Sequence, residues 1–201
     1  MKRFSSDKVY QQLFQTAFTK DENPVTVKNV QYSIASFIKT IVSFQSAYDK
    51  KMLNETEQKG LQLFQSKELK CSQCHSGVNF NQPQFQTSPY FNTGFFTDTF
   101  VNKGLFAFTK NKNDWGKYKV PTLRNLVFTA PYLHDGSAET LEQVIQLYEQ
   151  GGKPSAVNKH LFITGFKLNS QQRSELMAFL LSLSDSTVIT NNVFTNPWTI
   201  K

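Results

Sequence analysis

Apolar side chains recur every three or four residues in five stretches of the chain, which is the spacing of one face of a helix. These repeats fall at 9–18, 27–41, 61–64, 141–148 and 176–183. Polar segments separate them, such as the Pro-containing break at 20–24. Because most of the periodic signal is helical, the pattern predicts an all-α fold.

Residues that favour helix ends lie beside these repeats. Thr26 and Asn54 are expected to cap two of the helices, and two more are expected to begin at Thr140 and near Asn169 or Ser170. Asn54 is followed three residues later by Glu57, which is the pattern of a capping box. Gly151-Gly152 provides a stop for the helix that Thr140 begins.

Two segments lack a helical pattern. Between about 75 and 121 the chain is rich in Asn, Gln, Phe, Gly and Thr and has no sustained period. A loop of this length is uncommon in a compact domain unless it has a task, and wrapping a cofactor is one such task. The last segment, 186–201, has no clear period and is expected to form an extended tail.

Composition adds limits rather than detail. The 201 residues are 39% hydrophobic and include nineteen Phe, which suits a flat apolar ligand, although an AT-rich genome gives the same bias. The net charge is +7, but Lys and Arg are scattered. A solvated basic surface is therefore favoured over steering of anionic redox partners, and no basic stripe indicates nucleic-acid binding. No apolar run predicts a transmembrane helix, and the first residues lack a signal-peptide core.

The pentapeptide Cys71-Ser72-Gln73-Cys74-His75 is the attachment signature of c-type haem. It contains the only two cysteines of the chain. Two intervening residues let both thiols reach the same porphyrin edge, where each adds across one vinyl group. The adjacent His75 then supplies the proximal nitrogen ligand of the iron. The motif therefore predicts one covalent haem c anchored by Cys71 and Cys74.

Three other interpretations of the pentapeptide stay open from the residues alone. A structural zinc site needs four ligands, and His134 and His160 would have to complete it from distant positions. A thioredoxin-like redox pair belongs to a βαβ unit, whereas a predicted helix precedes Cys71. A disulfide between Cys71 and Cys74 would leave His75 without a role. Haem attachment is favoured because a helix precedes the motif and a long loop follows it.

The sixth iron ligand is less sharply indicated. Met52 lies in a charged stretch, and Met177, inside the last predicted helix, is better explained as a core residue. His134 and His160 lie in loops and remain candidates. Tyr148 occupies the apolar face of its helix, where its hydroxyl needs a partner, and Tyr is a known haem ligand. From the spacing alone, a core Tyr with a hydrogen bond is favoured over a ligand.

Further motifs follow one another in a fixed order. They are the helix at 34–43 with Tyr48-Asp49 after it, the pentapeptide, Lys-Val-Pro-Thr-Leu-Arg-Asn at 119–125, Thr-Ala-Pro-Tyr-Leu-His-Asp-Gly at 129–136, and Thr-Leu-Glu-Gln-Val at 140–144 running to Tyr148. Together, from about Tyr10 to Asp185, they resemble the C-terminal half of bacterial dihaem cytochrome c peroxidases, including the MauG-like branch. The resemblance implies a helical linking segment at 1–55, a c-type cytochrome domain with long haem-wrapping loops at 56–185, and a tail at 186–201.

The resemblance also implies roles for the haem. In this family an N-terminal haem reacts with peroxide, and a C-terminal haem passes electrons to it. The C-terminal haem has His and Met ligands in the peroxidases proper, and a Tyr replaces that Met in the MauG-like enzymes. The ligand position falls on Tyr148, which reverses the preference drawn from spacing. A phenolate favours ferric iron, so a low reduction potential is expected.

The same resemblance implies further contacts. The backbone carbonyls of Thr129 and Pro131 match two calcium ligands of the family, although another ligand belongs to the missing half and a plain turn explains this segment as well. Arg124 is expected either to pair with a haem propionate or to be an ordinary surface residue. His134 is expected to tune the haem environment or the domain interface, or to be structural.

One attachment motif instead of two is the main departure from the family. The peroxidatic haem, its acid–base Glu and the inter-haem Trp would precede Met1, so no catalytic residue is expected here. Either the chain is a fragment, which also explains the missing export signal of a periplasmic protein, or the second domain is supplied separately.

The expected function is electron relay within an oxidoreductase that reduces hydrogen peroxide. Its partners would be the missing N-terminal haem domain and a small redox protein or other electron donor. The alternative is a free-standing mono-haem electron-transfer cytochrome with no catalysis of its own.

Overall fold

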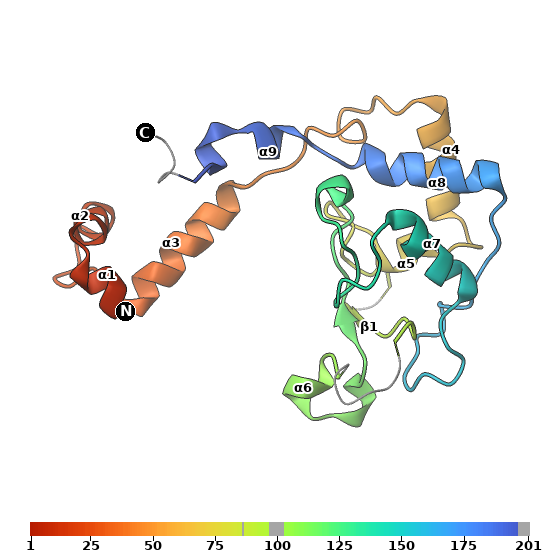
Figure 1. Cartoon of the computed structure of the whole chain (residues 1–201), viewed down its shortest axis with the longest axis horizontal. Coiled ribbons are helices and arrows are strands. Elements are labelled where there is room, and N and C mark those ends of the chain that lie inside the picture. Colours follow the sequence, from red (N-terminus) through yellow and green to blue (C-terminus); the bar gives the residue numbers. More distant parts are fainter. Residues whose placement is uncertain (86, 97–102, 197–201) are drawn as a thin grey trace. The chain divides into compact units, whose positions relative to one another are not determined.

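The computed structural model describes residues 1–85, 87–96 and 103–196 (Figure 1). These residues form two compact units. Unit 1 consists of Met1–Ser43 together with Val188–Lys201, and unit 2 consists of Phe44–Thr187. Unit 1 is therefore assembled from two segments that are far apart in the sequence, whereas unit 2 is continuous.

Three helices make up most of unit 1: α1 (Lys2–Ser6), α2 (Lys8–Ala17) and α3 (Val27–Thr40). Thr26 caps α3 by accepting a hydrogen bond from the Asn29 amide at 3.1 Å, which confirms the predicted start. The buried Asn29 amide group in turn donates to the Pro24 carbonyl and the Asp21 carboxylate. These bonds fix the turn between α2 and α3, because each buried polar group has a partner.

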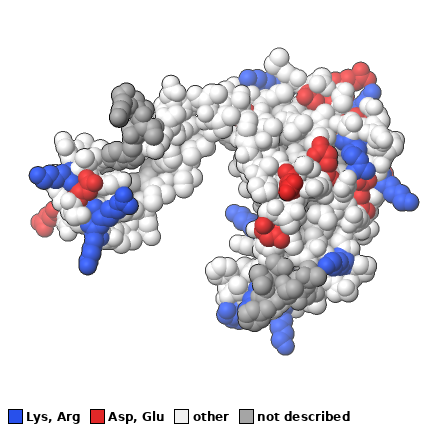
Figure 2. Space-filling model, in the orientation of Figure 1, with Lys and Arg blue, Asp and Glu red and all other residues white. Residues whose placement is uncertain are grey.

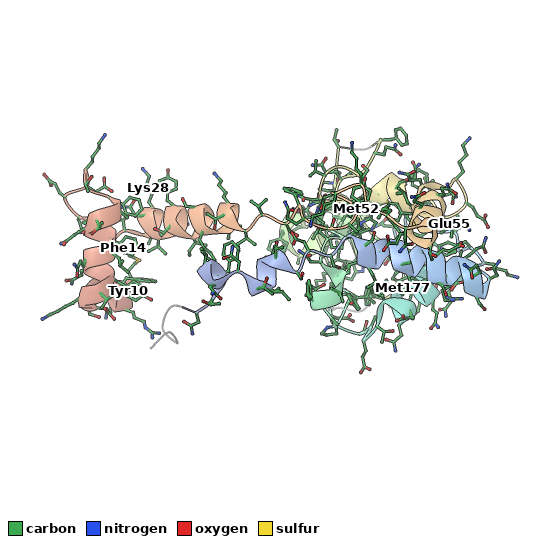
Figure 3. All side chains as sticks on the ribbon, turned by 90° about the horizontal axis from the view of Figure 1, so that it is seen from above. Tyr10, Phe14, Lys28, Met52, Glu55 and Met177 are labelled. Carbon is green, nitrogen blue, oxygen red and sulfur yellow. The ribbon has the colours of Figure 1, made fainter. Side chains whose placement is uncertain are left out.

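An apolar groove of about 470 Å³ runs between the helices of unit 1. It is lined by Phe4, Tyr10, Leu13, Phe14, Ala17, Phe18, Val30, Ser33, Ile34 and Phe37. Figure 3 labels Tyr10 and Phe14, which both project from α2. Phe14 is buried, but Leu13 and Ile34 are more than half exposed. Unit 1 therefore leaves much of its apolar helix surface open to solvent.

The C-terminal tail differs from the expected extended segment. It contains a short helix, α9 (Thr187–Thr190), and a 3₁₀ turn, η3 (Asn192–Phe194). The Asn191 side chain accepts a hydrogen bond from the Val193 amide at 3.0 Å and so starts the turn. Phe194 then makes an edge contact with the Phe37 ring of α3. Turns this short carry no periodic apolar pattern.

Unit 2 contains the longer helices α4 (Glu55–Gln65), α7 (Leu141–Gln150) and α8 (Ser170–Ser182). Shorter elements complete it: α5 (Cys71–Cys74), α6 (Phe106–Thr109), the 3₁₀ turns η1 (Lys112–Asp114) and η2 (Leu126–Phe128), and the strands β1 (Tyr90–Phe91) and β2 (Tyr118–Lys119). The strands are antiparallel, with Tyr90 opposite Lys119. The all-α prediction thus needs one amendment, since the segment predicted as loop contributes a small sheet.

The core of unit 2 forms where α4 packs against α8. Gly60 lets the two helices approach closely, because a Cβ atom at this position would lie 1.9 Å from the Glu175 carbonyl oxygen. The buried apolar side chains of this core are Phe64, Leu69, Phe80, Ile145, Leu176, Phe179, Leu180 and Leu183. Cys71 packs against the same cluster, so the predicted haem motif is attached directly to the core.

Charge and hydropathy agree with the sequence-based expectations at this coarse level. Figure 2 shows Lys and Arg spread over the visible face, with Asp and Glu among them, rather than gathered in one stripe. Every helix in the described ranges is too short or too polar to span a bilayer.

Candidate haem site

The pentapeptide predicted to attach haem consists of one helical turn, α5, followed by its C-terminal cap, His75. Lys70, in the left-handed region at φ 58°, turns the chain from the end of α4 into this helix. The His75 amide donates to the Cys71 carbonyl at 2.9 Å and closes the turn. Residues three apart on a helix share a face. The turn therefore places both thiols, which form no disulfide, on one side of α5, immediately before His75.

Both thiols lie in an apolar setting. Burial raises the pKa of the Cys71 thiol to about 12 and that of Cys74 to about 11. Reactive redox pairs use a thiolate, which needs a lowered pKa. No three His, Cys, Asp or Glu side chains gather as a metal site would require within the residues that the structure describes. The surroundings of Cys71 and Cys74 therefore favour thioether attachment over zinc binding or dithiol redox chemistry.

The tautomer of His75 is determined by its hydrogen bond. Its Nδ1 atom lies 2.9 Å from the Phe80 carbonyl oxygen. A carbonyl oxygen can only accept, so Nδ1 carries the proton and Nε2 keeps its lone pair. Burial lowers the pKa of His75, although the Phe80 and Pro121 carbonyls act in the opposite direction. The ring is therefore a neutral imidazole, which is the form that binds iron.

Tyr148 presents a hydroxyl group that no described residue hydrogen-bonds. It lies half-buried on α7, whose start is fixed by a capping box between Thr140 and Gln143. Its ring makes an edge contact with Phe95 at 4.8 Å between centroids. Among the described residues, no group hydrogen-bonds the phenol oxygen. Burial raises the pKa of Tyr148 above its usual range. Negative charge on Cys71 or Cys74 would raise this pKa further, which shows that the phenol lies close enough to both thiols to interact electrostatically.

These groups fit a covalently attached haem. Two partly buried thiols, an imidazole with an available nitrogen and a phenol that no described residue hydrogen-bonds belong to one region of unit 2. Apolar side chains that pack against the adjoining core include Leu123, Leu126 and Phe166. The Tyr148 hydroxyl, which no described residue hydrogen-bonds, is available to contact a bound group.

Arg124 is buried, with 7% of its surface exposed, so it is not the ordinary surface residue that was one of the two expectations. Its two terminal nitrogens donate to the two carboxylate oxygens of Asp49, each at 2.8 Å. Its Nε donates to the Val78 carbonyl, also at 2.8 Å. These contacts join the guanidinium group to Asp49 and to the loop that follows the haem motif.

The remaining predicted residues lie in other parts of unit 2. His134 is exposed, and its ring meets Phe96 and Tyr118 at 4.2 and 3.9 Å between centroids. Thr129 and Pro131 are exposed as well, in the segment that joins η2 to α7. The carbonyl oxygens of these two residues accept no hydrogen bond within the described part of the chain.

The other candidate iron ligands lie in three different surroundings. Met52 is 70% exposed in the segment before α4. Figure 3 labels Met52 and also Met177, which lies on α8. Met177 packs against the core, in keeping with its interpretation as a core residue. His160 lies between the Phe91 and Phe162 rings, at 4.8 Å from each.

Sequence reasoning missed two participants, Phe80 and Asp49. Phe80 contributes through its backbone carbonyl, which any residue type possesses, so its identity gives no signal. Asp49 was visible as part of a family motif, but its partner Arg124 is 75 positions away. An acidic residue and a distant Arg do not reveal their pairing in a single sequence.

Comparison with known proteins identifies relatives of one kind. A family model described as di-haem cytochrome c peroxidase matches residues 1–57. The chain is 33% identical to cytochrome c551 peroxidase of Nitrosomonas europaea, covering 87% of this chain and 49% of that protein. It is 30% identical to the methylamine utilization protein MauG of Methylorubrum extorquens, with the same two coverages.

A solved structure agrees with these relatives. The crystal structure of a MauG-like protein associated with microbial copper homeostasis matches with a TM-score of 0.86 and 32% identity, over 98% of this chain and 64% of that one. The chain spans about half the length of the curated relatives it matches. By its sequence motifs, its fold and these matches, the chain belongs to the dihaem cytochrome c peroxidase and MauG-like family.

Proposed function

We propose that this chain binds one haem c covalently and relays electrons, as the C-terminal half of a dihaem oxidoreductase that reduces hydrogen peroxide. The observation that carries the proposal is the combination of the attachment turn, Cys71 and Cys74, with the Nδ1–H tautomer of His75. The relatives are named as peroxidases or MauG, which supports haem-based peroxidase-type electron transfer.

Each residue of the site has a defined task in this proposal. Cys71 and Cys74 form the thioethers, and His75 offers Nε2 to the iron while its Nδ1–H stays on the Phe80 carbonyl. Tyr148 would offer its phenol oxygen as the second protein ligand of the iron. When bound, the haem supplies the one-electron chemistry. Because burial raises the pKa of Tyr148, the phenol gives up its proton only beside a strong positive charge, such as ferric iron.

A tyrosinate ligand determines the direction of the redox effect. An anionic oxygen donor stabilises ferric over ferrous iron, whereas a thioether such as Met does the reverse. The haem held by His75 and Tyr148 would therefore have a lower reduction potential than a His–Met haem. It could also support oxidation states above ferric, which suits a MauG-like enzyme more than an ordinary electron carrier.

The partner that carries the second haem would be an N-terminal haem domain, because the chain has one attachment motif and about half the length of its relatives. The open apolar groove of unit 1 offers a surface for it. A small redox protein or other donor would supply electrons, in the periplasm. The carbonyls of Thr129 and Pro131, which accept no hydrogen bond from the described residues, would supply calcium ligands only if that domain completes the set.

Spectroscopy of the haem-loaded protein tests the proposal. A pyridine haemochrome with a c-type band is expected from the wild type, and its absence would refute haem attachment. Cys71→Ala and Cys74→Ala variants should each leave a single thioether, which shifts that band.

The alternative, a free-standing mono-haem cytochrome, is favoured only by the single attachment motif. A peroxide assay with a reduced electron donor separates the two functions. The dihaem proposal expects turnover only when the polypeptide with the second haem is present. A lack of turnover in the reconstituted pair would support the simple carrier.

A further inference from the structure

The loop from Ser76 to Gln82 carries the carbonyl that determines the His75 tautomer. Ser76 and Gln82 close its base as an antiparallel bridge, with N–O distances of 2.9 and 3.2 Å. The Ser76 hydroxyl adds a third bond to the Gln82 carbonyl at 2.7 Å. The loop is thus closed at its base, immediately after the attachment motif.

Phe80, inside this loop, has an unfavourable backbone conformation. Its φ of 52° lies in the left-handed region, which a bulky L-residue rarely adopts. Such a conformation persists only where the surrounding structure determines it more than once. Its side chain is 6% exposed and packs on the Phe64, Tyr48 and Phe179 rings. Buried packing on one side and the bond to His75 on the other therefore hold this residue.

Three consecutive carbonyls of the loop accept hydrogen bonds from side chains. Val78 accepts from Arg124 Nε at 2.8 Å, and Asn79 accepts from the Thr122 hydroxyl at 2.6 Å. Phe80 accepts from His75 Nδ1 at 2.9 Å. The first two bonds come from one short segment that also connects internally, because the Arg124 amide donates to the Thr122 hydroxyl. This segment therefore fixes the path of the two residues before Phe80.

Arg124 is itself held rigidly. Asp49 receives both of its terminal nitrogens, and the Asp49 Oδ2 atom also accepts from the Ser46 hydroxyl at 2.5 Å and the Ser46 amide at 3.2 Å. The guanidinium group lies over the Phe44 and Phe80 rings, at 4.7 and 5.8 Å from their centroids. A fork-shaped ion pair with this many restraints gives the Nε–H a single direction.

We infer that Arg124, Asp49 and Thr122 are positioning residues for the iron ligand. They hold Val78 and Asn79 so that the Phe80 carbonyl stays on His75 Nδ1. A hydrogen bond on the far nitrogen of a metal-ligating His fixes the ring orientation and raises the basicity of the nitrogen that binds the metal. In this role the three residues act on the iron through His75. The inference rests on the proposed ligation of iron by His75.

Two variants of the haem-loaded protein test this role. Thr122→Val removes the tether to Asn79 at an exposed position, where folding is at little risk. Arg124→Lys keeps the charge but loses the fork that joins Asp49 to Val78. A less basic imidazole stabilises ferric iron less, so the reduction potential should rise. For Arg124→Lys we expect a tenfold change in the ferric-to-ferrous ratio, about 59 mV for one electron, and for Thr122→Val a smaller rise.

Leu176→Ala is the matched control, because it weakens the core from α8 without removing a hydrogen bond of the loop. Its reduction potential should stay at the wild-type value although its Tm falls. Unchanged potentials in both loop variants would overturn the inference, and so would an equal rise in Leu176→Ala. A wild-type protein without a c-type haem band would refute the proposed function and this inference together, whereas normal haem binding without a shift would refute the positioning role alone.

Discussion

Replacing Tyr148 by Phe removes one oxygen atom and keeps the ring against Phe95. In the haem-free protein this change costs little, because the hydroxyl makes no hydrogen bond with any described residue. Deleting a hydrogen-bonded buried hydroxyl typically costs about 1 kcal/mol, whereas deleting one without a partner is nearly neutral. We therefore expect the free energy of unfolding to change by no more than about 0.5 kcal/mol in haem-free Tyr148→Phe.

In the haem-loaded protein the same substitution removes the proposed iron ligand. The low-potential, six-coordinate ferric spectrum should disappear, and the reduction potential should rise because the anionic donor is lost. Optical and EPR spectroscopy measure the ligation, and urea unfolding of the haem-free protein measures the stability. A spectrum that is unchanged by Tyr148→Phe would show that another group, or none, binds opposite His75.

Tyr132→Phe is the control for this experiment. The Tyr132 hydroxyl donates to the Leu126 carbonyl at 2.7 Å, so its deletion should cost about 1 kcal/mol. The haem spectrum should not change, because Tyr132 is not proposed to bind iron. The two variants thus reverse the order of the effects: Tyr148→Phe alters the spectrum at constant stability, and Tyr132→Phe alters stability at constant spectrum. A shared pattern in both variants would contradict the assignment.

Three further predictions concern the fold and the thiols. Gly60→Ala should destabilise the protein by about 1–3 kcal/mol, since its Cβ would lie 1.9 Å from the Glu175 oxygen; a Tm equal to wild type would contradict the close helix contact. Burial raises the pKa of Asp49, but the hydrogen bonds from Arg124 and Ser46 and the charge of Arg124 outweigh burial and lower the pKa below 3.8. The carboxylate therefore stabilises the fold above that pH, and this stability is lost as the pH falls through the pKa of the folded state. In Asp49→Asn, the free energy of unfolding should fall less steeply as acid is added. The Cys74 thiol, with its pKa raised to about 11, should react slowly with iodoacetamide at pH 8 in the haem-free protein, and rapid labelling would show that it is not buried.

The elements that the sequence predicts well are those with local causes. Asn54 and Asn169 each begin a helix through a capping box, and both bonds join residues three positions apart. Such a pattern can be read directly from the order of the side chains. The attachment turn is local in the same sense, because five consecutive residues contain its whole chemistry.

The features that could not be predicted depend on distant or backbone contacts. The pairing of Arg124 with Asp49 joins positions 75 apart, and the sequence offered a propionate or solvent as the partner instead. The Phe80 carbonyl has no counterpart in a side-chain pattern. The small sheet between β1 and β2 has two residues in each strand, too few for an alternation to be visible. The ligand role of Tyr148 remains a prediction, supported by a hydroxyl that makes no hydrogen bond within the described part of the chain.

Unit 1 contains both early and late residues of the chain, so it depends on the C-terminal segment as well as on the first helices. Removing the residues after Thr187 would take Phe194 away from the Phe37 ring of α3. Unit 2 is continuous, so the same truncation would leave every one of its residues in place. Shortening the C-terminus should therefore disturb unit 1 while the surroundings of Cys71 stay intact.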